Sequence, residues 1–168
     1  QVPSYVPTTN LVAWWGFTGN VNDASPAGNN LTNTGAVLTT DRLGAANSAY
    51  QFNGSSQYMQ RATPTFSYGQ TSSFSVSWWV QRSATGYGVA LNQWEHFVAV
   101  YNAGAITLYK NGVPAGTNTF THTGAAQTTL PINIGRGVSG NYFSGKIDDI
   151  GIWTRALTAA EVGILFTG

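Results

Sequence analysis

Residues 145–166 read GKIDDIGIWTRALTAAEVGILF and decide the fold class of this chain. The first part has the alternation of a β-strand and carries two adjacent carboxylates, Asp148 and Asp149. The second part predicts one short helix, because Thr158 and Glu161 have the spacing of a capping box. The apolar stripe of this helix consists of Val162, Leu165 and Phe166.

The chain upstream of this joint shows short runs of β-branched and aromatic residues, separated by Gly, Asn and Ser. Residues 74–81 alternate, which predicts a half-buried strand with Trp79 on its polar face, and residues 97–101 predict a strand covered on both faces. The pair Asn111-Gly112 after residues 106–109 predicts a hairpin. This pattern is typical of a two-layer β-sandwich rather than of βαβ units.

The amino-acid composition excludes several classes of protein. The 168 residues suffice for one domain with its own core, and the absence of cysteine removes disulfides and thiolate metal sites. The net charge is +1 with only 8% charged residues and no basic run, so we expect no nucleic-acid partner. No apolar run reaches the length of a membrane span, so we expect no membrane insertion.

The start of the sequence predicts an exported protein. Residue 1 is Gln rather than Met, and the polar residues are mostly Ser, Thr, Asn and Gln, which favours a secreted, extracellular or cell-surface protein whose leader has been removed. Residues 1–9 contain Pro3 and Pro7 and predict an extended N-terminal arm. The remaining residues, 10–168, are expected to form one domain.

Taken in order, these motifs resemble the laminin-G-like branch of the concanavalin A-like lectin and glucanase jelly rolls. The matching motifs are LVAWWGF at 11–17, AYQFNG at 49–54, FSVSWWV at 74–80, NQWEHFVAVY at 92–101, LYKNG at 108–112 and GKIDDI at 145–150. The resemblance implies an all-β, two-sheet antiparallel jelly-roll sandwich with one short C-terminal helix. The domain is shortened between residues 82 and 93, where such domains usually carry two or three further strands that often line the concave face.

The carboxylates do not predict catalysis. The chain has six, and no two of them have the spacing of a glycosidase acid pair on one strand. On a regular strand the adjacent Asp148 and Asp149 point to opposite faces and cannot flank one bond. His96 lies in an apolar strand and is interpreted as structural, and no nucleophile elbow is present. We therefore expect no enzyme activity.

Residues 22–30 predict a calcium site. This loop offers a carboxylate, amide oxygens and turn carbonyls, which are the hard ligands that Ca²⁺ prefers. The resemblance implies a structural calcium ion held by such a loop and by an acid of the Ile-Asp-Asp strand, which nominates Asp23, Asn29 and Asp148. The alternative is that Asp23 and Ser25 form side-chain turns.

Aromatic residues predict a sugar site. Trp79 and Tyr87 are candidates to stack on a sugar ring, and Gln81 and Asn141 are candidates for its polar contacts. The alternative is that a neighbouring loop covers Trp79. The tryptophans assigned to the core or to sheet packing are Trp14, Trp15, Trp78 and Trp153.

The sequence thus predicts a non-catalytic, calcium-stabilised module for adhesion or carbohydrate binding. It is similar to laminin-G-like domains of bacterial secreted and surface proteins, so we expect a glycan or a surface protein as partner and a larger secreted polypeptide or assembly around it. The alternative is a structural or assembly subunit that makes protein–protein contacts on the cell surface or in a fibre.

Overall fold

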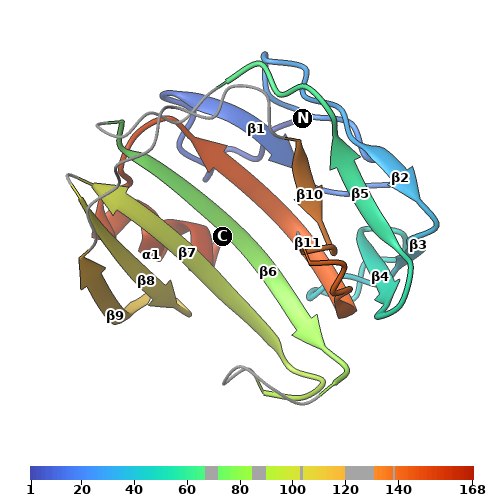
Figure 1. Ribbon diagram of the computed structural model, residues 1–168. Helices are drawn as coiled ribbons and strands as arrows, with labels where there is room; N and C mark the ends of the chain where they lie inside the picture. Colours follow the sequence, from blue (N-terminus) through green and yellow to red (C-terminus); the bar gives the residue numbers. More distant parts are fainter. Residues whose placement is uncertain (67–71, 85–89, 103, 120–130, 138) are drawn as a thin grey trace.

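The computed structural model of the chain describes all residues except 67–71, 85–89, 103, 120–130 and 138. In this part the chain forms strands β1–β11 and one helix, α1 (Figure 1). The bounds are β1 Leu11–Trp15, β2 Thr32–Thr34, β3 Val37–Thr39, β4 Ala49–Asn53, β5 Tyr58–Arg61, β6 Phe74–Arg82, β7 Trp94–Asn102, β8 Ala105–Lys110, β9 Val113–Thr119, β10 Ile132–Ile134, β11 Ser144–Trp153 and α1 Ala159–Thr167.

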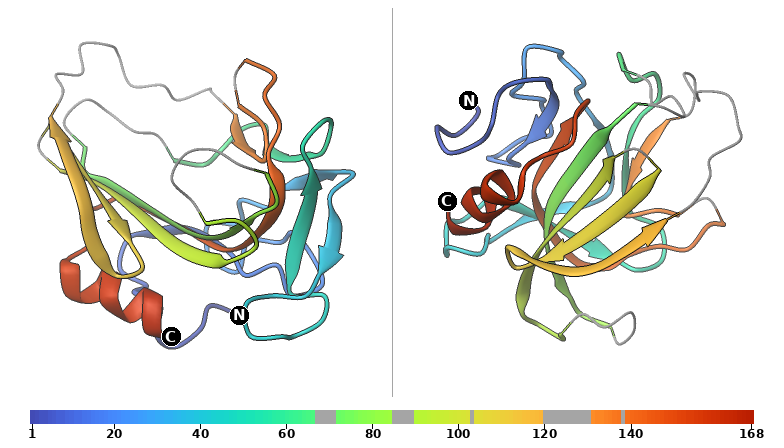
Figure 2. Two further views of the ribbon diagram at one scale, coloured as in Figure 1. Left: turned by 90° about the horizontal axis from the view of Figure 1, so that it is seen from below. Right: turned by 90° about the vertical axis from the view of Figure 1, so that its left-hand side faces the viewer.

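The strands form two antiparallel sheets. The large sheet has the order β3-β4-β11-β6-β7-β8-β9, with β1 also paired to β11, and the small sheet has the order β10-β5-β2. Figure 2 shows that the large sheet is strongly curved, with α1 against its convex side. The two-sheet sandwich with one C-terminal helix that the sequence predicts is confirmed.

Strands β6 and β7 form one long hairpin of the large sheet. They pair from Phe74 with Tyr101 through to Gln81 with Trp94. Within the described residues of the 83–93 connection, no strand joins the small sheet, which has three strands. The small sheet therefore covers only part of the concave face of the large sheet.

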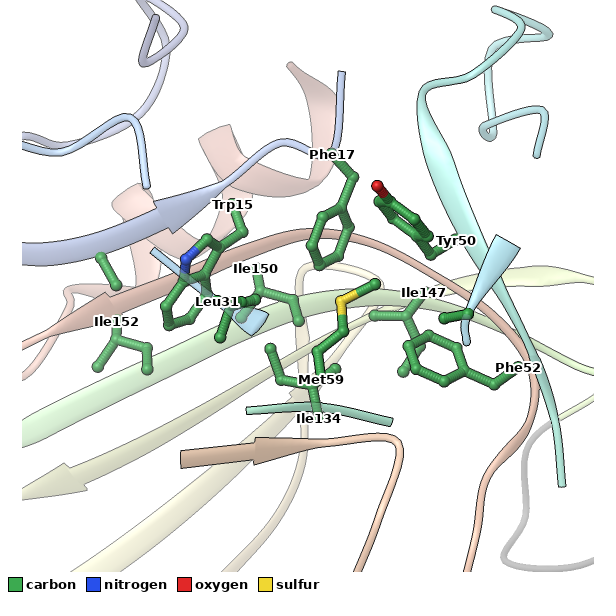
Figure 3. Close-up of a cluster of buried hydrophobic side chains, with 12 residues drawn as sticks. Trp15, Phe17, Leu31, Tyr50, Phe52, Met59, Ile134, Ile147, Ile150 and Ile152 are labelled. Carbon is green, nitrogen blue, oxygen red and sulfur yellow. The ribbon is translucent and has the colours of Figure 1, made fainter. Parts of the chain in front are cut away.

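The first core lies between the small sheet and the β1, β4 and β11 side of the large sheet (Figure 3). Met59 and Ile134 come from the small sheet and meet side chains of the large one. These include Trp15, Phe52, Ile147, Ile150 and Ile152. The Trp15 indole Nε1 donates to the Asn29 carbonyl oxygen at 2.9 Å, so its one polar atom is satisfied.

A second core lies on the convex side of the large sheet, under α1 and residues 1–9. Its buried members are Val6, Leu11, Trp14, Val98, Val100, Trp153, Leu157, Val162 and Leu165. Val6 is buried, and the Trp153 indole Nε1 donates to the Pro7 carbonyl oxygen at 2.6 Å. The N-terminal arm is thus packed on the domain.

Helix α1 begins with the predicted capping box. The Thr158 hydroxyl oxygen accepts from the Glu161 amide at 3.2 Å, and Glu161 Oε2 accepts from the Thr158 amide at 2.8 Å. Arg155 adds two hydrogen bonds to the same carboxylate, and these bonds lower the pKa of Glu161 to about 2. The cap therefore ties the helix to the end of β11.

The predicted hairpin joins β8 and β9. Asn111 and Gly112 have φ values of 51° and 80°, the left-handed backbone that a two-residue hairpin turn of this type requires. The Asn111 side-chain oxygen accepts from the His96 amide at 2.9 Å. A Cβ atom at position 112 would lie 3.1 Å from Phe166 Cδ1, so the turn is also packed against α1.

Candidate functional site

The concave face of the large sheet carries a hollow of about 550 Å³ beside the small sheet. Its floor consists of Trp78 and Val80 from β6, Phe97 from β7 and Leu108 from β8. Its walls consist of Gly54, Arg82, Ala84, Gly135, Gly137, Asn141, Tyr142, Phe143 and Ser144. The hollow lies where the small sheet does not cover the large one.

The floor of the hollow is an aromatic platform. Trp78 and Phe97 are cross-strand partners whose rings stack with centroids 5.7 Å apart and planes 19° apart. The Lys110 ammonium lies 5.9 Å from the centroid of Phe97 and forms an ion pair with Glu95 at 2.7 Å. Such a flat apolar surface suits the C–H face of a sugar ring.

Asn141 is the one predicted sugar contact that the structure places in the wall of the hollow. Arg82 and Ser144 add a guanidinium and a hydroxyl to this wall. Gly137 donates its amide to the Asn141 carbonyl oxygen at 2.8 Å, which fixes the turn that presents the Asn141 side chain. A few polar groups around an aromatic floor are the usual make-up of a small-ligand site.

The prediction for Trp79 is wrong, because this side chain lies on the convex side of the sheet and is only 7% exposed. The Phe166 ring of α1 stacks on it at 5.8 Å, and the Arg42 guanidinium lies 4.6 Å from its centroid. Trp78, predicted to be a core or sheet-packing residue, does pack against the first core, but it also lines the hollow. The covered and the open tryptophan of this pair are thus exchanged relative to the predicted sugar site.

The physical reason for this exchange is that the polar face of β6 is the more deeply buried one. Ser75 and Ser77 are at most 1% exposed. The Ser75 hydroxyl accepts from the Leu157 amide at 2.9 Å and donates to the Arg155 carbonyl oxygen at 3.0 Å. Serine hydroxyls with such partners cost little to bury, so polarity did not indicate exposure.

Two further residues predicted to contact a sugar are not among the described residues that line the hollow. Gln81 lies on the same face of β6 as Trp79, and its amide nitrogen donates to the Asn92 carbonyl oxygen at 3.3 Å. Tyr87 lies outside the described residues. Trp78, Phe97 and Tyr142 were missed, although the shortened 82–93 connection was a signal that the apolar face of β6 would be left uncovered.

The structure does not bring Asp23, Asn29 and Asp148 together as calcium ligands. Asp23 accepts four hydrogen bonds, from the amides of Trp14, Ser25 and Asn29 and from the Ser25 hydroxyl, all within 2.8 Å. The alternative of side-chain turns at Asp23 and Ser25 therefore describes this loop. Among the residues in view, no three His, Cys, Asp or Glu side chains group as a metal site.

Asn29 is likewise occupied by the protein. It is fully buried, its side-chain oxygen accepts from the Thr65 amide at 3.0 Å, and its side-chain nitrogen donates to the Val12 carbonyl oxygen at 2.8 Å. These bonds tie the loop to β1 and to residue 65. The residues present do not fit the calcium site that the resemblance implied.

Asp148 and Asp149 lie on one side of β11, which corrects the expectation that strand alternation separates them. The register of β11 against β6 shifts between Asp148 and Gly151, and Asp149 has a left-handed φ of 44°. This β-bulge turns both carboxylates towards Arg42 Nη1, at 3.5 Å for Asp148 and 2.5 Å for Asp149. All three side chains are largely buried beneath the convex face.

Burial shifts the titration of this cluster. Desolvation, followed by the charge of Asp149, raises the pKa of Asp148 to about 8, while Asp149 keeps the closer contact with Arg42. Desolvation lowers the pKa of His96 to about 4, and its Nε2 lies 2.8 Å from the Ser77 hydroxyl. His96 is thus a structural histidine, as the sequence predicted, and burial favours its neutral form.

The family comparison agrees with this architecture. Residues 82–163 match the laminin-G model described as the concanavalin A-like lectin/glucanases superfamily. The resemblance expected from the sequence is confirmed: this model matches the second half of the chain, and the fold is that of a concanavalin A-like jelly roll. Comparison with curated protein sequences finds no match.

Solved structures of binding domains share the fold. Domain 4 of AbnA, a GH43 extracellular arabinanase from Geobacillus stearothermophilus in complex with arabinotriose, superposes with a TM-score of 0.76 at 21% identity, covering 92% of this chain and 97% of that one. The binding domain of Paraclostridial Mosquitocidal Protein 1 gives 0.73 at 18% identity, over 94% of this chain and 52% of that one. The ligand binding domain of botulinum neurotoxin serotype D with N-acetylneuraminic acid gives 0.68 at 14% identity, over 96% and 51%.

This chain spans about half the length of those two toxin domains. At these identities, the similarity concerns the fold. No helix in the described part of the chain has the length and apolar character needed to cross a bilayer.

Proposed function

We propose that this protein is a non-catalytic carbohydrate-binding module that works outside the cell or on its surface. The observation that carries the proposal is the stacked Trp78–Phe97 platform at the floor of the open concave hollow. A sugar ring placed on this platform buries its C–H face against the indole, and Asn141 and Ser144 in the wall meet its hydroxyls.

The similar solved structures support this proposal. AbnA domain 4 is an extracellular enzyme's domain solved with arabinotriose, and the serotype D toxin domain was solved with N-acetylneuraminic acid. Both share the jelly-roll sandwich with this chain. An exported binding module of a larger polypeptide is consistent with such relatives.

The composition of the hollow supports binding without catalysis. None of the described residues that line it is an acid, and glycosidases need two carboxylates beside the scissile bond. The nearest acid by register is Glu95, which lies opposite Val80 and is held by the Lys110 ammonium and the Ala90 amide.

A glycan array followed by calorimetric titration tests this proposal. We expect wild type to bind a subset of glycans and Trp78→Ala to lose at least about tenfold in affinity, because a stacking aromatic in a site contributes more than about 1.4 kcal/mol. Leu43→Ala is the matched control, since Leu43 is 76% exposed on a turn that does not line the hollow. Unchanged binding by Trp78→Ala would exclude the hollow as the glycan site.

A structural or assembly role is the second candidate, and strand β9 favours it. β9 ends the large sheet, all seven of its residues are exposed, and none of them is charged. Such an edge strand can pair with a strand of another chain. Light scattering together with the glycan array distinguishes the two functions. An assembly role would be favoured if the wild-type protein forms a stable oligomer, if Thr117→Lys dissociates this oligomer into monomers, and if no glycan binds.

A further inference from the structure

A second cavity, of about 230 Å³, lies between the two sheets beside the hollow, and we call it the inter-sheet cavity. Its described lining is almost wholly apolar and consists mainly of five isoleucines from β10 and β11, with Val76 and Trp78 of β6 and Trp15 of β1. Figure 3 shows two of these side chains, Trp15 and Ile152, in the first core. Protein interiors contain few voids larger than a water molecule, so a space of this size is an exception.

The chemistry of this lining favours an apolar occupant over water. None of the described residues that line the cavity is charged. Asn133 is among them, but Ile132 and Ile134 on either side of it point into the core, so its side chain points to the outer face of the small sheet. There its oxygen accepts from Gln60 Nε2 and Arg136 Nη2, each at 2.9 Å. A buried water molecule needs several polar partners, and this lining does not offer them.

The inter-sheet cavity is continuous with the hollow. Trp78 and Gly135 line both spaces. Of the side chains that line the cavity, Val76, Trp78 and Ile132 are only partly buried, whereas Trp15 is fully buried. The cavity therefore has an open end towards the hollow and a closed end in the first core.

The size of the cavity determines which chemical group fits it. An apolar cavity of about 150 Å³ is known to take a benzene molecule. The 230 Å³ between the sheets has room for one aryl ring or a short alkyl chain. A sugar ring is a poor occupant, because its hydroxyls would lie against isoleucine side chains without hydrogen-bond partners.

We propose that the inter-sheet cavity is a subsite for the apolar part of the ligand, an aryl or short alkyl group joined to the sugar that lies on the platform. The ligand is then a glycoside of a phenol or of an aliphatic alcohol. Its sugar stacks on Trp78 and Phe97, and its apolar group passes Trp78 and Gly135 into the cavity. This inference rests on the proposed function of the hollow and adds the substrate class.

Benzene alone tests the cavity without any sugar. The chain has seven isoleucines, of which five line the cavity and two, Ile106 and Ile164, do not. In methyl NMR spectra of the wild-type protein, we expect benzene to cause saturable shifts at the five and none at the other two. No saturable shift at the five, or equal shifts at all seven, would overturn the inference.

Two variants fill the cavity from opposite walls. Val76→Phe on β6 and Ile132→Phe on β10 each place a ring in the cavity and should abolish the benzene shifts. Because they fill empty space, their melting temperatures should equal or exceed that of wild type. Val37→Phe is the matched control, since Val37 is 60% exposed on β3 and lines neither space, and it should leave the shifts unchanged. Shifts that persist in both filling variants, or a lower melting temperature in both, would overturn the inference.

Paired glycosides test whether the cavity and the platform bind one ligand. The probes are the phenyl and methyl α-L-arabinofuranosides and the phenyl and methyl β-D-galactopyranosides, each titrated into wild type and Val76→Phe. We expect the phenyl member of at least one pair to bind wild type about tenfold more tightly than its methyl partner, because its ring leaves water, and Val76→Phe to remove this preference. Equal affinities within both pairs, or no binding by any probe, would overturn the assignment of the cavity to the ligand of the hollow.

The two proposals fail in different ways. If Trp78→Ala abolishes glycan binding on the array while Val76→Phe leaves the phenyl preference and the benzene shifts unchanged, the hollow is a glycan site without the proposed subsite. If benzene shifts the five isoleucines but no glycan or glycoside binds, the cavity takes apolar groups and the proposed glycan function of the hollow fails.

Discussion

The two faces of β6 carry the same kind of side chain in opposite settings. On the convex face Trp79 is covered by Phe166 and Arg42, and on the concave face Trp78 lines an open hollow. The convex face buries serines, a histidine and two carboxylates with partners, while the concave face leaves an apolar platform uncovered. In this molecule the polarity of a side chain does not reveal which face meets solvent. The elements that pack on each face decide this.

Replacing each of the two tryptophans by alanine should give the largest difference in stability between the two faces of β6. Trp79→Ala should destabilise the domain by about 3–5 kcal/mol, the cost of removing a large buried aromatic, and Trp78→Ala by less than half as much. Urea unfolding at equilibrium measures both. Equal losses of stability would mean that Trp78 is as much a core residue as Trp79.

Removal of Arg42 should be the next largest effect. Arg42→Leu leaves Asp148 and Asp149 buried without their cation, and breaking such a buried pair costs about 3 kcal/mol. Lys146→Ala is the control, because it also removes a cation, and its free energy of unfolding should stay within about 0.5 kcal/mol of wild type. A double variant, Arg42→Leu with Asp149→Asn, should recover part of the loss, and its failure to do so would locate the effect of Arg42 in packing against Trp79.

The pH dependence of stability should show the smallest effect. Asp148 has a raised pKa in the folded state, so its contribution is complete below pH 3.8, the unfolded value, and is lost as the pH rises towards about 8. His96 has a lowered pKa, so its contribution is complete above pH 6.5 and is lost as the pH falls towards about 4. Below pH 6.5 the contributions of Asp148 and His96 to the slope of unfolding free energy against pH have opposite signs. Above pH 6.5 only the contribution of Asp148 changes with pH.

Melting curves between pH 6.5 and 8 therefore isolate the carboxylate pair. The free energy of unfolding should fall with rising pH by at most about 1.4 kcal/mol per unit in wild type, and Asp148→Asn should flatten this slope. A wild-type curve that is flat in this range would show that the bulge keeps Asp148 ionised.

The sequence predicted the strands, the hairpin and the capped helix because each of them depends on neighbouring residues. Alternation over residues 74–81, the Asn111-Gly112 pair and the Thr158–Glu161 spacing are local signals. Family resemblance then arranged these elements into two sheets. The secondary structure and the fold were therefore accessible without coordinates.

The candidate site was harder to predict because its residues meet over long separations. Alternation distinguishes two faces of β6 but does not say that the helix 80 residues later covers the one with Trp79. Regular strand geometry predicts Asp148 and Asp149 on opposite faces of the sheet. The β-bulge instead turns both side chains to one face, where they contact Arg42, a residue over 100 positions away in sequence. Asn141 was predicted only from its amide group, and the structure places it in the wall of the hollow.

The hairpin turn between β8 and β9 has a consequence for engineering. Tight Asn-Gly turns are attractive places to insert tags or dyes, but Asn111 accepts from the His96 amide and Gly112 faces Phe166 without room for a side chain. An insertion there would separate α1 from the sheet and disturb the strand that carries Leu108. A reporter group for glycan titrations is better attached at Leu43, whose side chain is the most exposed large apolar one in the described chain.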